Sequence, residues 1–93
     1  MARISWTEQA LSDIQEICGF IEKDSFRYAQ IFADKVFAAV ENLSKYPELG
    51  RVVPEYNNAR IREIIFGNYR IIYKYKHDEI VILTVYHSAR LLD

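Results

Sequence analysis

The stretch RIREIIFGNYRIIYKYKHDEIVILTVY (residues 60–86) decides the fold. It contains three runs rich in Ile, Val and Tyr, a composition typical of β-strands. The runs span residues 60–66, 69–76 and 79–86. Gly67-Asn68 and His77-Asp78 separate them, and each pair suits a two-residue hairpin turn. The stretch therefore predicts three consecutive antiparallel strands.

The residues before this stretch show the spacing of two helices. Thr7 and Ser25 are candidate N-caps, and after each of them apolar side chains recur every three or four positions. The apolar positions are Leu11, Ile14, Ile17, Cys18 and Ile21 in the first segment, and Ala29, Phe32, Ala33, Val36, Val40 and Leu43 in the second. Because only about three residues join the two segments, they predict an antiparallel helical hairpin.

Two further segments complete the prediction. Residues 2–6 alternate like a short strand, and residues 47–58, which hold both prolines, indicate an irregular loop. We therefore expect a single α+β domain over residues 1–93, in the order β-αα-βββ, with the helical hairpin packed on one face of a mostly antiparallel sheet. The sequence leaves open whether the first strand joins this sheet at an edge or in the middle.

The composition excludes several classes of protein. Apolar residues make up 51% of the chain, which is too many for a disordered tail. A single Cys forms neither an internal disulfide nor a zinc site, and no stretch reaches the roughly 18–20 apolar residues of a membrane span. We therefore expect a cytoplasmic protein with no metal, no cofactor and no membrane contact. The formal net charge of −1 argues against tight binding to nucleic-acid phosphates.

The two hairpin turns set the register, and with it the two faces of the sheet. One face is expected to pack on the helices, and it collects Ile64, Phe66, Tyr69, Ile71, Tyr73, Tyr75, Ile80, Ile82, Thr84 and Tyr86. The opposite face, called the open face below, collects Ile61, Glu63, Ile65, Arg70, Ile72, Lys74, Val81, Leu83, Val85 and His87.

No helix remains to cover the open face, and a monomer rarely leaves so large an apolar patch in water. We therefore predict that a partner chain binds there. Its predicted contacts are Ile61, Glu63, Ile65, Arg70, Ile72, Lys74, Leu83, Val85 and, beyond the last strand, Arg90.

Three segments resemble one known family. GNYRIIY (residues 67–73) and VYHSAR (residues 85–90) carry the most specific part of the resemblance, and YPELGRVVPE (residues 46–55) precedes them. Together, in this order and at this chain length, they are similar to the RelE/ParE superfamily of toxins from type II toxin–antitoxin systems. The resemblance implies the RelE/ParE-like fold, a growth-inhibiting toxin of the kind linked to plasmid stabilization, and a cognate antitoxin that wraps the toxin and can join it into an oligomer.

The superfamily offers two kinds of activity. ParE-like members poison DNA gyrase, whereas RelE-like members are metal-independent endoribonucleases that cut mRNA on the translating ribosome. RelE-like enzymes carry basic residues at two positions that correspond here to Ile61 and Glu63, so the resemblance favours the ParE-like branch. A nuclease variant would use Glu55 as the base, Arg70 to stabilise the phosphorane and His87 as the acid.

Two other interpretations stay open at this stage. Arg70 can simply pair with Glu63, which lies diagonally opposite on the same predicted face. The chain can also be a relic that is no longer toxic and only binds an antitoxin.

Overall fold

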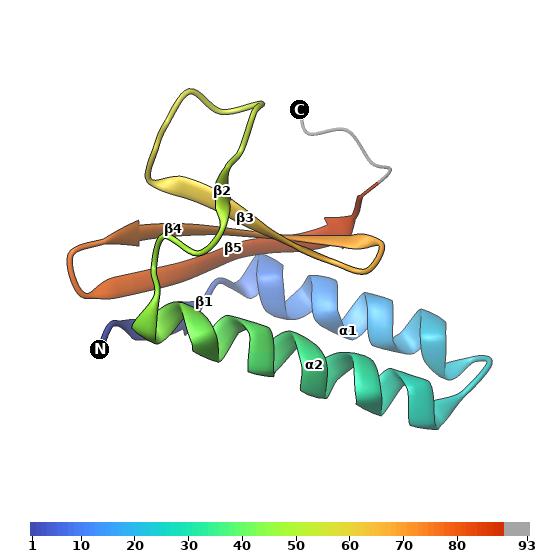
Figure 1. The fold of residues 1–93 in the computed structure, drawn as a ribbon. Coiled ribbons are helices and arrows are strands. Elements are labelled where there is room, and N and C mark those ends of the chain that lie inside the picture. Colours follow the sequence, from blue (N-terminus) through green and yellow to red (C-terminus); the bar gives the residue numbers. More distant parts are fainter. Residues whose placement is uncertain (89–93) are drawn as a thin grey trace.

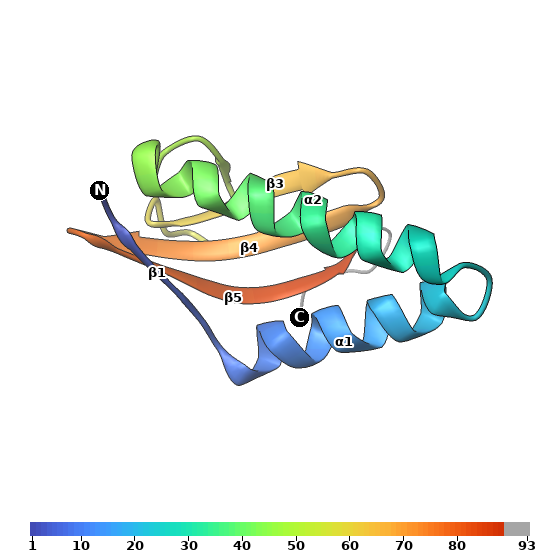
Figure 2. The same cartoon turned by 90° about the horizontal axis from the view of Figure 1, so that it is seen from below.

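The computed structural model describes residues 1–88 (Figure 1). The helices and strands follow in the order β1 (Arg3–Trp6), α1 (Glu8–Glu22), α2 (Phe26–Lys45), β2 (Arg51–Val52), β3 (Ile61–Phe66), β4 (Tyr69–Lys76) and β5 (Glu79–His87). Both helices lie on one face of the sheet, as the view from below in Figure 2 makes clear. This arrangement confirms the predicted α+β fold, with a helical hairpin on one face of the sheet.

Within residues 1–88, the sheet has five strands in the order β1-β5-β4-β3-β2. The first strand, β1, joins at an edge and runs parallel to β5, which settles the position that the sequence left open. Strands β3, β4 and β5 form the predicted meander, and Gly67 and His77 in its turns have φ angles of 55° and 54°. At the other edge, β2 pairs with β3, so residues 47–58 hold a short strand where only a loop was predicted.

Both helices begin at the predicted caps. The hydroxyl of Thr7 accepts a hydrogen bond from the Ala10 N–H, and the hydroxyl of Ser25 accepts one from the Tyr28 N–H. The predicted stripe of α2 is confirmed at five of its six positions, since Ala33 is only half-buried; the buried residues are Ala29, Phe32, Val36, Val40 and Leu43. Helix α2 ends at Lys45, two residues before Pro47, which cannot continue a helix.

The prediction for α1 is wrong at one position. Leu11 is 47% exposed, and its neighbour Ala10 is fully buried instead. The cause is the rotation of the helix: Asp13 accepts hydrogen bonds from the Val85 N–H, at 3.0 Å, and from the Thr84 hydroxyl of β5. With Asp13 turned toward β5, Ala10 faces the sheet and Leu11 turns away, since successive helical residues point about 100° apart.

A β-bulge in β5 overturns part of the predicted register. As predicted, Tyr73 pairs with Ile82. The register then shifts, so that Ile72 pairs with Thr84 and Leu83 becomes an extra residue in β5. Because side chains alternate along a strand, Val85, Tyr86 and His87 beyond the bulge point to the faces opposite to those predicted.

The bulge moves three side chains. Val85, predicted on the open face, is buried in the main core with the helices. His87, predicted on the open face, pairs with Tyr69 on the helix side. Tyr86, predicted under the helices, pairs with Arg70 and packs on the open face.

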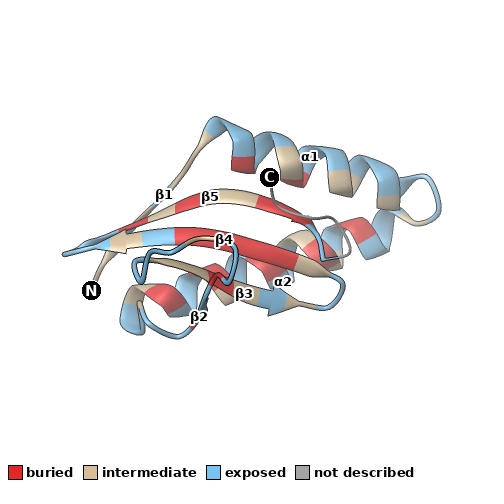
Figure 3. Cartoon of the chain, turned by 90° about the horizontal axis from the view of Figure 1, so that it is seen from above, coloured by how far each residue is buried: buried red, intermediate tan, exposed pale blue. Residues whose placement is uncertain are grey.

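The prediction that the open face is uncovered is also wrong. The loop after β2 folds back over this face, and Figure 3 shows it crossing in front of buried β4. Val53 in this loop is fully buried against Ile72 and Tyr86, and these residues form a second, smaller core. The loop prediction missed this cover because the loop has no regular structure, yet it supplies apolar side chains of its own.

Candidate functional site

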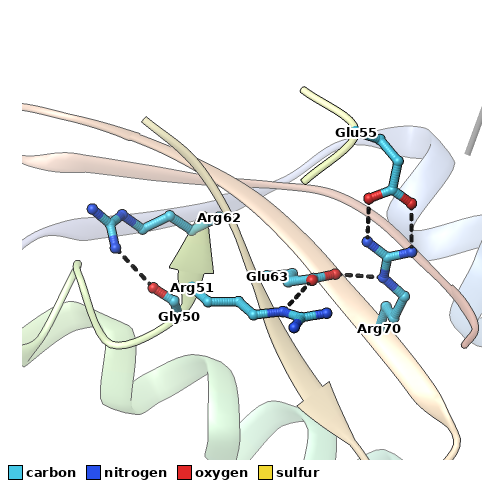
Figure 4. Close-up of polar contacts among 6 residues, drawn as sticks. All are labelled: Gly50, Arg51, Glu55, Arg62, Glu63 and Arg70. Carbon is cyan, nitrogen blue, oxygen red and sulfur yellow. Dashed lines mark hydrogen bonds and ion pairs between the residues drawn. The ribbon is translucent and has the colours of Figure 1, made fainter. Parts of the chain in front are cut away.

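Arg70, the candidate catalytic arginine, lies at the centre of a charged group on the open face (Figure 4). Its Nε donates to Glu63 Oε1, and its Nη1 and Nη2 donate to the two carboxylate oxygens of Glu55 at 2.9 and 3.0 Å. Arg51 Nε donates to the second oxygen of Glu63 at 2.6 Å. Arg51, Glu55, Glu63 and Arg70, called the charge cluster below, therefore contain two positive and two negative groups that neutralise each other.

The charge cluster ties together segments that are distant in the sequence. Glu63 lies on β3 and Arg70 on β4, one diagonal step apart, and they form the ion pair that the sequence left open as one interpretation of Arg70. Arg51 on β2 pairs with Glu63 in the sheet register as well as through its side chain. Glu55 comes from the covering loop. The cluster therefore holds the loop against the sheet.

Burial decides what these charges can do. Glu63 is 1% exposed and Arg70 is 7% exposed. The hydrogen bonds from Arg70 lower the pKa of Glu55, and the same bonds are the largest cause of the raised pKa of Arg70. A carboxylate with a lowered pKa and with both oxygens occupied accepts a proton poorly. Three of the five N–H groups of Arg70 donate to protein carboxylates, and these two carboxylates offset its charge, so its attraction for a phosphate is weakened.

Tyr86 completes the surroundings of Arg70. The guanidinium carbon lies 5.5 Å from the centre of the Tyr86 ring, a cation–π distance. The hydroxyl of Tyr86 is buried and has no hydrogen-bond partner in the described part of the chain. Burial raises the pKa of Tyr86 to about 12. Tyr86 therefore acts as an apolar wall of the site, with one polar atom left unsatisfied.

The three predicted catalytic residues do not converge. Glu55 and Arg70 are brought together, but His87 lies on the helix side of the sheet with its ring centre 5.5 Å from that of Tyr69. A general acid and a stabilising arginine must reach the same phosphate. In this arrangement the sheet separates them.

The residues predicted to bind a partner are divided between environments. The buried ones are Glu63, Arg70, Ile72 and Val85, the half-buried ones are Ile61 and Leu83, and the exposed ones are Ile65 and Lys74. Arg90 lies outside the described residues. The predicted partner face is therefore largely occupied by the chain's own loop, and Ile65 and Lys74 remain accessible on it.

Sequence reasoning missed the residues through which the loop makes these contacts. Val53 fills the second core, Tyr56 packs at its margin, and Arg51 reaches the buried Glu63. The one signal available was the apolar pair Val52 and Val53 between the two prolines, which is unusual for a solvent-exposed loop.

The fold defines a class of protein: a small α+β domain in which a helical hairpin and a loop enclose the two faces of a mixed sheet. A model of the family described as "ParE toxin of type II toxin-antitoxin system, parDE" matches residues 4–92. The chain therefore belongs to the ParE family of toxins from type II toxin–antitoxin systems. As the toxin component of such a system, it has a cognate antitoxin as its partner.

Two relatives agree with this assignment. "Putative toxin Y4kP" of Sinorhizobium fredii (strain NBRC 101917 / NGR234) is 36% identical over 91 residues, which cover 92% of this chain and 88% of that protein. A solved structure titled "Chromosomal ParDE TA system from P. aeruginosa" matches with a TM-score of 0.76 and 19% identity, and the match covers 94% of this chain and 96% of that one. This structural match shows a shared fold.

Residues 1–88 lack the features of two other kinds of site. No helix in that range is long and apolar enough to cross a membrane. The same range holds no group of three or more His, Cys, Asp or Glu side chains placed to bind a metal ion.

Proposed function

We propose that this toxin acts in the cytoplasm by binding a protein target, DNA gyrase, and not by cutting mRNA. The observation that carries the proposal is the pairing of Arg70 with two carboxylates of its own chain. Glu63 and Glu55 occupy its nitrogens, and His87 lies across the sheet. An mRNA endonuclease without a divalent metal needs an accessible cation beside the scissile phosphate, together with an acid and a base.

The charge of the protein supports the same proposal. Lys and Arg number 12, against 13 Asp and Glu, which gives a net charge of −1. A nuclease that docks on ribosomal RNA gains affinity from each phosphate that it neutralises. A toxin that binds a protein does not need a positive surface.

The test is an assay with purified components. The full chain is added to purified DNA gyrase and relaxed plasmid, and both ATP-dependent supercoiling and the appearance of linear DNA are measured. In parallel, the chain is added to a translating extract, and primer extension maps any cuts in the mRNA. We expect loss of supercoiling or accumulation of linear DNA, with intact mRNA.

Two outcomes would contradict the proposal in different ways. Codon-dependent cuts in the mRNA that disappear in a His87→Asn variant would establish the ribosome-dependent nuclease instead. No effect on gyrase, on mRNA or on growth after induction, together with tight antitoxin binding, would identify a non-toxic relic.

A further inference from the structure

We propose that the hollow between the end of α2 and the β4–β5 turn is a docking site for an acidic segment of the cognate antitoxin, anchored by one large apolar side chain. The hollow has a volume of about 550 Å³ and is lined by Tyr46, Pro47, Glu48, Leu49, Tyr75 and His77. Figure 1 shows the segment that follows α2, which supplies four of these lining residues, rising from the helix toward the sheet. The proposal rests on family membership and does not depend on gyrase as the target.

The lining is apolar and accessible. Tyr46 is 62% exposed and Leu49 is 59% exposed, three residues apart at the mouth of the hollow. Large apolar side chains that gather around a concavity mark a binding site more often than isolated ones do. The hollow therefore has room and contact surface for one apolar anchor residue of a partner.

The walls of the hollow are held in place before any partner arrives. The Tyr75 hydroxyl donates to Glu48 Oε1 at 2.9 Å, and the Tyr73 hydroxyl donates to the Pro47 carbonyl at 2.7 Å. The Leu49 N–H donates to the Tyr46 carbonyl at 3.0 Å. A preformed site loses little conformational entropy on binding, which favours affinity.

The charges around the hollow select an acidic partner. The guanidinium of Arg62 lies 5.6 Å from the centre of the Tyr75 ring, which forms one wall of the hollow. The backbone of Arg60 accepts a hydrogen bond from the Tyr75 N–H. Glu48 is the one acidic residue of the lining, and its carboxylate already accepts from Tyr75. Arg62 therefore places a positive charge beside the hollow.

Helix α1 is acidic, and none of its residues lines the hollow. Helix α1 carries Glu8, Asp13, Glu16 and Glu22 and contains no Lys or Arg. An acidic segment is repelled by α1 and attracted to the hollow, because complementary charge sets the orientation of binding partners. Of the partners of this toxin, family membership establishes the antitoxin, so we assign the acidic segment to it.

The test uses the product of the gene adjacent to that of this chain, co-expressed with the chain and then separated from it. Its affinity is measured by calorimetric titration with the wild-type chain and with Tyr46→Ser and Leu49→Ser variants. We expect each variant to bind about tenfold or more weakly, as for the central residues of an interface. Tyr28→Ser is the matched control, because Tyr28 is 67% exposed on the opposite end of α2, and we expect wild-type affinity.

A photo-crosslinking amino acid at position 46 identifies the segment itself. We expect mass spectrometry to find it joined to an antitoxin peptide with Asp or Glu around a large apolar residue. Wild-type affinity of both the Tyr46→Ser and the Leu49→Ser variants, or a crosslink to a basic peptide, would overturn the proposal. Loss of gyrase inhibition by the Tyr46→Ser variant would also overturn it, because the hollow would then serve the target. Failure of gyrase inhibition by the wild-type chain would affect only the proposed function.

Discussion

Glu55 and Arg70 are joined by two parallel hydrogen bonds of 2.9 and 3.0 Å, although 15 residues separate them in the chain. This pair attaches an irregular loop to the sheet, at the place where the sequence predicts a surface for a partner. The same guanidinium holds the buried carboxylate of Glu63. Arg70 is therefore a structural residue of this toxin, and its pairing with Glu55 explains why the loop covers the open face.

We predict that Arg70→Met destabilises the protein strongly. The substitution leaves Glu63 buried with only the exposed Arg51 as a partner, and breaking a buried ion pair from one side typically costs about 3–5 kcal/mol. Unfolding in urea measures the change. The double variant Arg70→Met/Glu63→Leu removes both buried charges, and we expect it to recover much of the stability. A double variant that is less stable than the single one would contradict this account.

We predict that the free energy of unfolding decreases at acid pH because Glu55 becomes protonated. The bonds from Arg70 lower the pKa of Glu55 in the folded protein below its value in the unfolded chain. A lowered pKa means that the stabilisation is fully present above the unfolded value, about 4.3, and is lost as the pH falls below it. Urea midpoints between pH 7 and pH 3 should therefore fall more steeply for the wild type than for Glu55→Gln. Parallel curves would refute the prediction.

We predict opposite effects when two buried tyrosines lose their hydroxyls. Tyr73→Phe removes the acceptor of the Gly50 N–H and the donor to the Pro47 carbonyl, so it should cost about 1–3 kcal/mol. Tyr86→Phe removes a buried hydroxyl that has no partner in the described structure, so its stability should be equal to the wild type or higher. Thermal and urea unfolding of both variants decide the matter, and equal losses would contradict the prediction.

The titration of Tyr86 offers a second measurement on the same residue. Burial raises its pKa to about 12, above the usual value of about 10 for an exposed tyrosine. Absorbance of the folded protein near 295 nm should show tyrosine ionisation near pH 12 that is missing in Tyr86→Phe. The protein must be shown by circular dichroism to remain folded at that pH. If the two titration curves coincide over the folded range, Tyr86 has an ordinary environment.

We predict that Gly50→Ala destabilises the protein and Gly19→Ala does not. A Cβ at Gly50 would lie 2.5 Å from the carbonyl oxygen of Glu63 and 2.8 Å from the Tyr73 ring, whereas a Cβ at Gly19 meets nothing within 4 Å. Overpacking of this kind costs about 1–3 kcal/mol. Replacement of glycine in the exposed middle of α1 by alanine should instead stabilise the helix by about 0.5–1 kcal/mol. Chemical denaturation compares the two variants, and equal stability would be evidence against the close approach at Gly50.

The family and the main elements of the fold could be predicted from the sequence, because they depend on local patterns. The caps Thr7 and Ser25, the spacing in α2 and the two hairpin turns each involve residues close together in the chain. Such patterns act through backbone geometry over a few positions, and they predicted every element except β2. The pairing of Arg70 with Glu63 also followed, because the turn at Gly67 sets their register.

The faces of β5 and the closure of the open face were decided only by the tertiary structure. The bulge at Leu83 lies where β5 leaves β1 and meets Asp13 of α1, a contact between residues more than 70 positions apart. No local signal marks this shift, and one extra residue reverses the faces of Val85, Tyr86 and His87 beyond it. In the same way, the position of the loop depends on two contacts with β4. Val53 packs against Ile72, and Glu55 forms an ion pair with Arg70. The sequence by itself determined the elements and the family, while contacts between distant segments determined which face is buried and where a partner has room to bind.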